Sequence, residues 1–572
     1  MCGILGGSKK NWKYQEALES ISYRGPDGIR IKELNGFTLG FVRLAIMDLS
    51  ENGMQPMPSS DQNVWITYNG EIYGYQNLKK KLEKKGYKFN STSDTEVILN
   101  AYLEYGDKFV EYIDGIFAIV IYDFRIKKLK LYRDRVGVKP IYYYDDGKEF
   151  AFASELKELV ALCNDVSFEI DYTAIYDYLT YTYIPEPKTM YKKIHKLPPA
   201  CAIIYDFESK KIVKKIRYWS LKVNVFQEKK EKKSEIYENI RTLVSEAVKE
   251  QMVADVPVGS FLSGGIDSSI VTYECMKINP NIETFSIGFT EKKYDELKYA
   301  DMLSEKYSIT KNQQIVNKNL FQSLYYKLKD WYDEPYSDAS AFPTYLVSKL
   351  ARQKVTVVLT GDGGDELFGG YNRYSGFIKM EIGNNRKKCF SSLYENLLRP
   401  FLYEGMREEK DKKFLEDVAR CCFLYEYMIK SEKKKFSKEW HINRDYDDYW
   451  YFRKYYNKEL PPITRMQYMD FYTYLPSDIL TKVDRASMQN SLEARVPLLS
   501  KKLIEYAFSL SEEERCPKGA LKGALKSAYE GIIPDEILYR RKMGFGIPRN
   551  YLKHDVSQQE EFLRDIWKIT LK

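Results

Sequence analysis

Residues 256–269 read VPVGSFLSGGIDSS, an apolar run that leads directly into a loop of serines, glycines and one aspartate. Two other apolar runs end in the same manner: residues 282–287 stop at Gly288, and residues 355–359 stop at the loop TGDGGDE (360–366). Short buried-type runs separated by helical stretches are typical of a parallel sheet with crossover helices. Ligands of such sheets bind at the carboxyl ends of the strands, where these loops fall. The sequence therefore predicts an α/β domain with its ligand site at the polar loops.

The loop SGGIDSS (263–269) has the features of an anion site. Its glycines let the backbone approach a phosphate, the helix start supplies N–H groups, and its serines add hydroxyl donors. Asp267 is a hard oxygen ligand of the kind that Mg²⁺ prefers, whereas the lysine of a Walker loop is absent. In GDGGDE (361–366) the acids repel one another unless a cation or a substrate neutralises them. Each loop could instead be a solvated turn, but the two together predict a Mg²⁺–triphosphate site.

The N-terminal part of the chain shows many short strand patterns and few helical stretches. Helices are expected at residues 75–85 and 94–104, and strands at residues 37–44, 63–68, 116–122, 129–133, 141–144 and 150–153. This density predicts sheet packed on sheet with helices outside. The run QEKKEKK (227–233) follows, without apolar anchors; it is a solvated face or, because the pattern changes there, a linker.

The composition excludes several classes of protein. The chain has 572 residues, 44% of them hydrophobic and 30% charged, as in a soluble globular protein of several domains. A net charge of +8 falls short of the basic footprint of a nucleic-acid binder, and the longest apolar run, residues 116–122, is too short for a membrane span. The start lacks the features of a signal peptide, and the eight cysteines contain no C-x-x-C pair. We expect a cytoplasmic, multi-domain enzyme or assembly protein.

Cys2 is a candidate nucleophile, with a structural free cysteine as the alternative. Removal of Met1 would expose the α-amine of Cys2, whose pKa of about 7.7–8.0 suits it to activate the thiol. This mechanism needs no histidine, and the chain has only three. The segment NGE (69–71) offers an amide and a backbone N–H as oxyanion donors, and Arg43 can grip a carboxylate with two parallel hydrogen bonds. Glu71 and Asp94 could hold an ammonium group.

Motifs along the chain resemble two linked families. The N-terminal motifs resemble the class II glutamine amidotransferase domain with an N-terminal nucleophile: MCGILGG (1–7), SYRGPDG (22–28), RLAIMDLS (43–50), NGEIY (69–73), SDTEV (93–97), RDRVGVKPIYY (133–143) and FASELKEL (152–159). The later motifs resemble the synthetase domain of the asparagine synthetase family: SGGIDSS (263–269), TFSIGF (284–289), TGDGGDELFGGY (360–371), KVDRASM (482–488), SLEARVPLL (491–499) and RKMGFGIP (541–548).

The resemblance implies a fold, a reaction and domain boundaries. A four-layer αββα glutaminase domain (2–205) would be followed by a linker (206–234) and an adenine-nucleotide α-hydrolase-like synthetase domain (235–572). Glutamine would be hydrolysed in the first domain, and its ammonia would reach an acyl-AMP in the second through an internal passage. ATP and Mg²⁺ are the implied cofactors. The implied partners are small-molecule substrates, with no nucleic acid and no membrane, and a homodimer is left open.

The resemblance also assigns residues to roles. Cys2 is the nucleophile, and Asn69 with Gly70 forms the oxyanion hole. Glutamine is held by Arg43, Leu44, Ala45, Ile46, Met47, Glu71 and Asp94. ATP is bound by Phe261, Ser263, Gly264, Gly265, Asp267, Ser268, Ser269, Ile287, Thr360 and Gly361. Mg²⁺ is held by Asp267 and Asp365. Asp362 occupies the place of the catalytic acid linked with the acyl-adenylate step, where many asparagine synthetases carry Glu, and Asp484 also lies at the nucleotide end. Lys518 in KGALK (518–522) is the catalytic cation that faces the developing phosphate charge.

The acceptor is the open point of this assignment. The family's usual His is Phe41 here, and its usual Asp after P-F-L is Ser500. Arg495 is the candidate cation for the spectator carboxylate of the acceptor, and a structural ion pair with Glu493 or another acid is the alternative. We expect a glutamine-hydrolysing asparagine synthase. The alternatives are an amidotransferase that acts on another carboxylate, such as a sugar acid or a peptide, and a non-catalytic scaffold protein.

Overall fold

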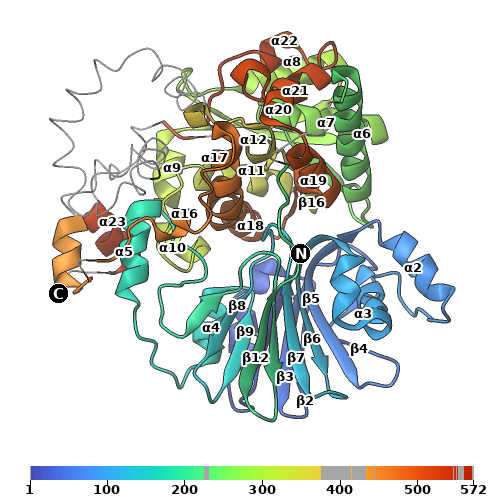
Figure 1. The fold of residues 1–572 in the computed structure, drawn as a ribbon, viewed down its shortest axis with the longest axis vertical. Coiled ribbons are helices and arrows are strands. Elements are labelled where there is room, and N and C mark those ends of the chain that lie inside the picture. The colour runs from blue at the N-terminus through green and yellow to red at the C-terminus, as the bar shows by residue number, and fades with distance from the viewer. Residues whose placement is uncertain are drawn as a thin grey trace.

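The computed structural model describes residues 2–224, 231–374, 414, 433–443, 445–544, 546–548, 551 and 559–569. Two bodies lie one above the other, a β-rich N-terminal one and a mixed α/β C-terminal one (Figure 1). No helix among these residues is long and apolar enough to cross a membrane.

The N-terminal body contains two six-stranded antiparallel sheets. The first has the order β10(Ile194–Lys196), β8(Tyr142–Asp145), β9(Phe150–Ala153), β1(Gly3–Gly7), β3(Phe37–Arg43), β2(Gly28–Leu34). The second has the order β12(Lys211–Arg217), β11(Cys201–Asp206), β7(Lys128–Arg133), β6(Asp114–Asp123), β5(Val64–Tyr73), β4(Met57–Pro58). All strands expected from the sequence are present. The hairpin β11–β12 extends the second sheet into the range 206–234, which therefore contains a strand as well as any linker.

Helices cover the outer faces of both sheets and complete an αββα sandwich. Buried residues such as Phe41, Val120 and Leu131 pack between the sheets. Helices α1(Tyr14–Glu19) and α4(Leu156–Leu162) pack outside the first sheet, and α2(Tyr75–Glu83) and α3(Asp94–Tyr105) outside the second (Figure 1). Both expected helices are therefore found, and the predicted layer order is confirmed.

The C-terminal body is built on a five-stranded parallel sheet with the order β15-β14-β13-β16-β17. The three apolar runs form β13(Val258–Phe261), β14(Glu283–Phe289) and β16(Val357–Leu359), as predicted. The polar strand β15(Thr310–Val316) and the charged strand β17(Glu493–Arg495) escaped prediction because they carry few apolar residues, although β17 is fully buried.

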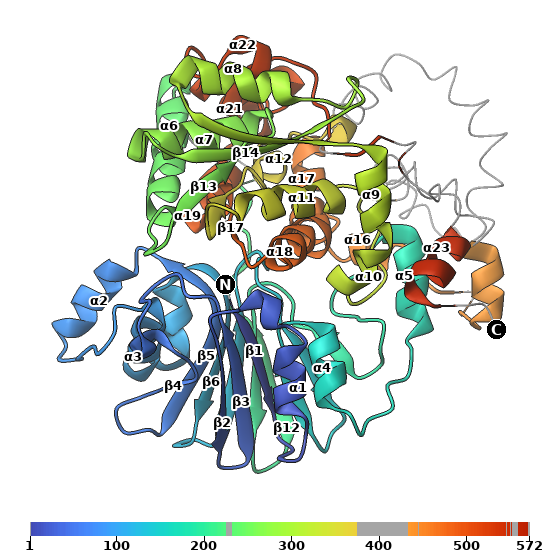
Figure 2. The same cartoon turned by 180° about the vertical axis from the view of Figure 1, so that it is seen from behind.

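Helices lie on both faces of this sheet, whereas α16(Trp450–Arg453) and α23(Gln559–Trp567) lie apart from it beside α5(Tyr172–Tyr181) (Figure 2). The other helices of this body are α6(Lys233–Gln251), α7(Ile266–Ile278), α8(Leu297–Tyr307), α9(Lys318–Leu324), α10(Leu328–Trp331), α11(Ala341–Ala351), α12(Gly364–Phe368), α17(Pro462–Tyr472), α18(Leu480–Met488), α19(Lys501–Ser509), α20(Glu512–Arg515), α21(Gly523–Ala528) and α22(Asp535–Leu538). Helix α5 of the N-terminal half packs against α16 through Tyr181 and Phe452. Helix α18 and strand β17 face the N-terminal body, so the two bodies meet where β1 begins.

Candidate active sites

A cavity lies in the N-terminal body where it meets the C-terminal one. Cys2 stands directly before the buried strand β1, and residues 69–71 lie near the end of β5. Ser93 caps helix α3 by accepting a hydrogen bond from Thr95 N, and this cap places Asp94 in the first turn. The cavity is lined by Cys2, Phe41, Arg43, Leu44, Ile46, Met47, Gly53, Gln55, Tyr68, Gly70, Glu71, Ser93, Asp94, Thr95 and Glu493.

Cys2 is oriented by its backbone and carries a neutral thiol. Its N–H donates to Asn69 Oδ1 at 3.0 Å, and its Sγ lies 3.8 Å from the carbonyl oxygen of Leu44. Burial raises the pKa of the Cys2 thiol. A thiol in this state reacts as a nucleophile only with a base beside it, and the α-amine of the same residue would be such a base.

Asn69 and Gly70 have the features of oxyanion donors. The Asn69 side chain is fully buried, and its Nδ2 has no hydrogen-bond partner among the described residues. A buried N–H₂ without a partner is costly unless a ligand accepts from it. At Gly70 any side chain is excluded, because a Cβ would lie 2.0 Å from the carbonyl oxygen of Ile116. The chain therefore passes close to β6 here.

Arg43 is held rigidly at the wall of the cavity. Its Nη1 donates to the carbonyl oxygen of Ser50 at 2.8 Å, its Nη2 donates to that of Asp48, and the side chain is buried. Both acceptors are backbone carbonyl oxygens and not carboxylates, so the positive charge of Arg43 remains available to an anionic ligand.

Two buried carboxylates lie elsewhere on the cavity wall. Burial raises the pKa of Asp94 to about 6, although hydrogen bonds from Ile72 N at 2.9 Å and from Tyr68 Oη at 2.8 Å oppose the shift. Burial and the nearby Asp94 raise the pKa of Glu71 well above its usual range. A bound cation would relieve both shifts, so this wall suits an ammonium group.

The cavity contains most of the glutamine-site residues expected from the sequence. Ala45 is not on its wall; its N–H instead donates to Asp27 Oδ2 at 2.8 Å. Seven wall residues were not among the predicted site residues: Phe41, Gly53, Gln55, Tyr68, Ser93, Thr95 and Glu493. Gln55 accepts a hydrogen bond from Tyr68 N at 2.6 Å, and no sequence motif marks that role.

The predicted nucleotide loops lie side by side at the carboxyl ends of β13 and β16. A Cβ on Gly361 would lie 2.5 Å from Ser268 N, and one on Gly364 would lie 2.2 Å from Asp267 Oδ1. Only glycine permits this close approach of the second loop to the first. Ser263 Oγ and Ser268 Oγ are 3.0 Å apart, and Gly265 N donates to Ser263 Oγ at 3.3 Å, which shapes the first loop. Both loops thus converge at the N-terminus of α7.

The acids Asp267 and Asp365 meet two lysines at this point. Lys522 Nζ pairs with Asp267 Oδ2 and, at 2.6 Å, with Asp365 Oδ1, and Lys542 Nζ pairs with Asp365 Oδ2. Burial opposes ionisation of Asp365, but the two lysines bring its pKa below the usual range. Burial raises the pKa of Asp267, and Lys522 only partly offsets it. In this ion-paired cluster two lysines balance two aspartates.

The donor set fits a magnesium ion only with help from a ligand. Asp267 Oδ1 is buried and accepts no hydrogen bond, and no group of three or more potential metal ligands exists within the described ranges. Mg²⁺ is commonly held by one or two carboxylates together with substrate phosphates, so Asp267 and Asp365 suit a metal that arrives with a nucleotide.

The sequence predicts Lys518 for this site, but the structure places Lys522 there. Lys518 lies on the surface, where its N–H donates to Glu513, whereas Lys522 is buried between the two aspartates. The repeat GALKGALK (519–526) offers equivalent motifs four residues apart, and only the packing of α21 distinguishes them. Lys542, from RKMGFGIP (541–548), was also missed.

Asp362 lies in the second loop, near the expected position. Thr360 Oγ1 donates to its Oδ2 at 2.7 Å. Lys482, in helix α18, lies near the acids Asp338 and Asp362. Burial lowers the pKa of Lys482, but these two acids raise it overall. Lys482 Nζ lies 3.2 Å from Asp338 Oδ2.

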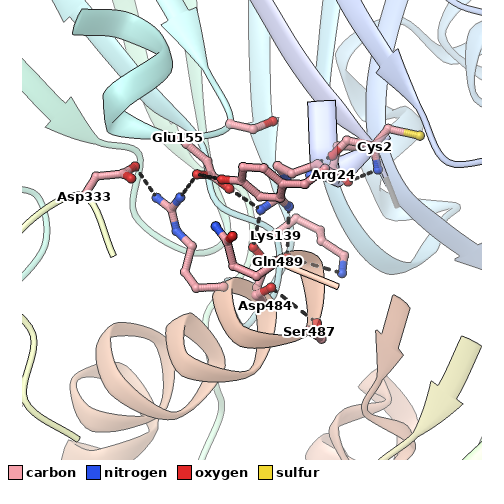
Figure 3. Close-up of polar contacts among 12 residues, drawn as sticks. Cys2, Arg24, Lys139, Glu155, Asp333, Asp484, Ser487 and Gln489 are labelled. Atoms are coloured by element: carbon pink, nitrogen blue, oxygen red, sulfur yellow. Dashed lines mark hydrogen bonds and ion pairs between the residues drawn. The ribbon is translucent and has the colours of Figure 1, made fainter. Parts of the chain in front are cut away.

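Asp484 does not lie at the nucleotide end. It is buried at the junction of the two bodies, where Arg24 grips it with Nη1 and Nη2 at 2.9 and 3.1 Å and Lys139 Nζ lies 3.8 Å away (Figure 3). Arg24 also pairs with Glu155 at 2.8 Å, and its Nε donates to the carbonyl oxygen of Cys2 at 3.2 Å. Asp484 therefore serves the junction beside the thiol.

Arg495 does not lie at the acceptor position predicted from the sequence. Its Nε pairs with Glu493 Oε1 at 2.6 Å, which is the structural alternative considered for it, and its Nη2 lies 3.2 Å from Glu71 Oε2. The side chain faces the glutamine cavity. Sequence alone could not reveal this, because the direction of a strand's side chains toward another domain is a tertiary property.

Comparisons with known proteins agree with this arrangement. The family profile described as "Asparagine synthase" matches residues 239–568, and that described as "Glutamine amidotransferase domain" matches residues 1–219. The chain is 35% identical over 593 residues to "Asparagine synthetase [glutamine-hydrolyzing] 1" of Bacillus subtilis (strain 168), covering 99% of this chain and 90% of that protein.

Two other relatives differ in coverage and identity. The "Putative asparagine synthetase [glutamine-hydrolyzing] 2" of Methanocaldococcus jannaschii is 39% identical over 410 residues, covering 67% of this chain and 78% of that protein. The "Amidase chry2" of Gibberella zeae is 25% identical over 622 residues, covering 96% of this chain and 87% of that protein.

Proposed function

The chain belongs to the asparagine synthase family, and from that premise we propose that it is a glutamine-hydrolysing, ATP-dependent ligase that makes asparagine from aspartate. One observation carries the proposal. The same chain holds a partly buried thiol in a cavity with Arg43, which is anchored by backbone carbonyls, and two acids of raised pKa, and a separate acidic loop pair at the ends of a parallel sheet. The first suits glutamine and the second suits a nucleotide.

The cavity is complementary to each end of glutamine. Arg43 would bind the α-carboxylate, and Glu71 with Asp94 would bind the α-ammonium. The carboxamide would then lie beside Cys2. If Met1 is removed, the α-amine of Cys2 takes the thiol proton, and the sulfur attacks the carboxamide carbon. Asn69 Nδ2 and Gly70 N–H would stabilise the oxyanion, after which ammonia leaves and water hydrolyses the thioester to glutamate.

The second site would activate the acceptor. A carboxylate oxygen of the acceptor attacks the α-phosphorus of ATP, pyrophosphate leaves, and an acyl-AMP forms. Residues 263–269 would hold the pyrophosphate through backbone N–H groups and hydroxyls. Lys522 and Lys542 would stabilise the charge that develops on the phosphates. Mg²⁺, held with the phosphates by Asp267 and Asp365, would supply further positive charge. Ammonia then displaces AMP from the acyl-AMP carbonyl to give the amide.

The acceptor is the finer part of the proposal. The names of two relatives favour aspartate, whereas the amidase of Gibberella zeae shows that a chain alike over most of its length can carry another name. Arg495 no longer supplies the cation for aspartate's second carboxylate, because its guanidinium faces Glu71. Another carboxylate, such as a sugar acid or a peptide, is the alternative acceptor.

A panel of carboxylates tests the acceptor directly. Pyrophosphate release is measured with ATP, Mg²⁺ and glutamine, and with aspartate, glutamate, a uronic acid or a peptide as acceptor. We expect aspartate to give release in step with asparagine. Release with a different carboxylate, and none with aspartate, would transfer the proposal to the alternative. The absence of both glutaminase activity and pyrophosphate release would favour a non-catalytic scaffold.

A further inference from the structure

Strand β17, at the edge of the synthetase sheet, contributes to the wall of the glutamine cavity. Side chains two residues apart on a strand point to the same face, so Glu493 and Arg495 point together. Glu493 lines the cavity, and Arg495 Nη2 lies 3.2 Å from Glu71 Oε2. A residue of the second domain thus contacts a residue that we assign to glutamine in the first.

The guanidinium of Arg495 has a fixed position. It is 0% exposed, its Nη1 donates to the carbonyl oxygens of Gln251 at 2.8 Å and Val253 at 2.7 Å, and its Nε pairs with Glu493 at 2.6 Å. These contacts use Nε and Nη1 and leave Nη2 for Glu71. A planar group anchored along one edge presents the other edge in one orientation.

Glu71 needs such a partner. It is buried beside Asp94, and both burial and that neighbour disfavour its charged form, whereas Arg495 favours it. The remaining ionisable groups near Glu71 are the N-terminal amine, which also favours the charged form, Glu493 from β17, and Tyr68, Tyr73 and Tyr75 from its own body. Among the groups described around this carboxylate, Arg495 is the cation in direct contact with it.

We propose that Arg495 is a positioning residue of the glutaminase site, supplied by the synthetase domain, which fixes the Glu71 carboxylate where it meets the ammonium group of glutamine. The inference rests on the proposed function. It makes the glutamine site composite, so that the first domain alone does not complete it. The same residue also touches the nucleotide loop, since its carbonyl oxygen accepts a hydrogen bond from Thr360 N at 2.9 Å. One residue therefore links the two sites.

The test replaces Arg495 in the full chain. Arg495→Gln removes the charge but keeps a donor that can reach a carbonyl. We expect KM for glutamine in the glutaminase reaction to rise at least about tenfold, because Glu71 loses the ion pair that favours its charged form, with kcat changed less than about threefold. The acid limb of kcat/KM for glutamine should move to higher pH, because Glu71 must be ionised to bind ammonium and is protonated more easily without the guanidinium.

Arg515→Gln is the matched control. Arg515 is equally buried but bonds only to the carbonyl oxygens of Ala507 and Leu510 and to Thr464 and Gln467, far from the cavity lining. Its loss should leave the glutamine KM and the acid limb unchanged. This control separates a general loss of stability from an effect on Glu71.

Several results would overturn the proposal. It is wrong if folded Arg495→Gln keeps the wild-type glutamine KM and acid limb, or if glutaminase and ammonium-dependent activities fall together while the limb stays in place. Should that variant not fold, Arg495→Lys decides the matter. Lysine keeps the charge without the fork, so KM should rise while the limb moves little, and an unchanged KM contradicts the proposal. Wild-type protein without any glutaminase activity would instead refute the proposed function itself.

Discussion

The glutamine cavity and the nucleotide loops both bury a pair of acids, but they treat the charge differently. In the cavity, burial raises the pKa of Asp94 to about 6 and raises that of Glu71 well above its usual range, and Arg495 is the side-chain cation that opposes both shifts. In the loops, Lys522 and Lys542 pair with Asp365 and bring its pKa below the usual range.

The difference explains what each site can accept. A buried acid with little compensation gains most from a cationic ligand, so the cavity suits the ammonium group of an amino acid. At the loops, two lysines balance the charge of two acids, so a metal enters there only with the phosphates that it shares. Pairs of buried acids thus suit a cationic ligand in the cavity and a metal–phosphate ligand at the loops.

The largest expected effect is confined to the cavity. Cys2→Ala should lower glutaminase activity by a factor on the order of 10⁴ or more, because the attacking atom is lost. Ammonium-dependent amide formation should survive, because the thiol takes no part in ATP chemistry. Glutamate release and ammonium-driven pyrophosphate release, measured side by side, check this. Cys201→Ala, at a half-buried free cysteine of β11, is the control, and retained glutaminase in Cys2→Ala would refute the nucleophile.

The second prediction concerns the nucleotide loops, where a substitution should remove the ATP reaction and spare glutamine hydrolysis. Asp365→Asn should reduce pyrophosphate release by about 10³-fold or more, because the metal and both lysines lose a charged partner, and glutaminase activity should largely remain. Asp301→Asn, whose ion pair with Lys311 is partly exposed, serves as the control. Near-normal amide formation by Asp365→Asn would show that the loop pair is not the nucleotide site.

Lys518 and Lys522, four residues apart, test which lysine serves the nucleotide loops. Lys522→Ala should lower pyrophosphate release about 100-fold, because the cation between the aspartates is lost, whereas Lys518→Ala should stay near wild type. Steady-state rates with saturating ATP check the pair. Equal losses, or a larger loss at Lys518, would restore the assignment made from the sequence motif.

The smallest effect concerns recognition of glutamine. Arg43→Lys keeps the charge but loses the planar fork, so KM for glutamine should rise about tenfold with ammonium-dependent activity unchanged. Arg30→Lys, at a partly exposed arginine of β2 paired with Glu51, is the control. An unchanged KM in Arg43→Lys would place the carboxylate of glutamine elsewhere in the cavity.

The sequence predicts what local pattern encodes. Apolar runs that end in glycine-rich loops marked β13 and β16, whereas residues 69–71, expected to follow a strand, lie within β5, which continues to Tyr73. The pattern could not identify β17, where two of the three residues are charged although the strand is buried. It could not choose between Lys518 and Lys522, because a tandem repeat gives both the same neighbours and only burial separates them.

Contacts between the two bodies were also beyond the sequence. Asp484 and Arg495 lie in motifs shared with the synthetase domain, yet their side chains meet Arg24 and Glu71 of the first domain. Which face of a helix or strand meets another domain depends on docking and not on local periodicity.

The central claim is that the two sites work in series, with nitrogen released in the cavity consumed at the loops. The most direct measurement supplies glutamine labelled with ¹⁵N in its amide, together with aspartate, ATP, Mg²⁺ and an excess of unlabelled ammonium, and follows the label in the product by mass spectrometry. The account predicts asparagine that carries mostly ¹⁵N, formed in equal amount with AMP and pyrophosphate. Asparagine whose label matches the diluted ammonium pool, or glutamine hydrolysis without asparagine, would contradict it.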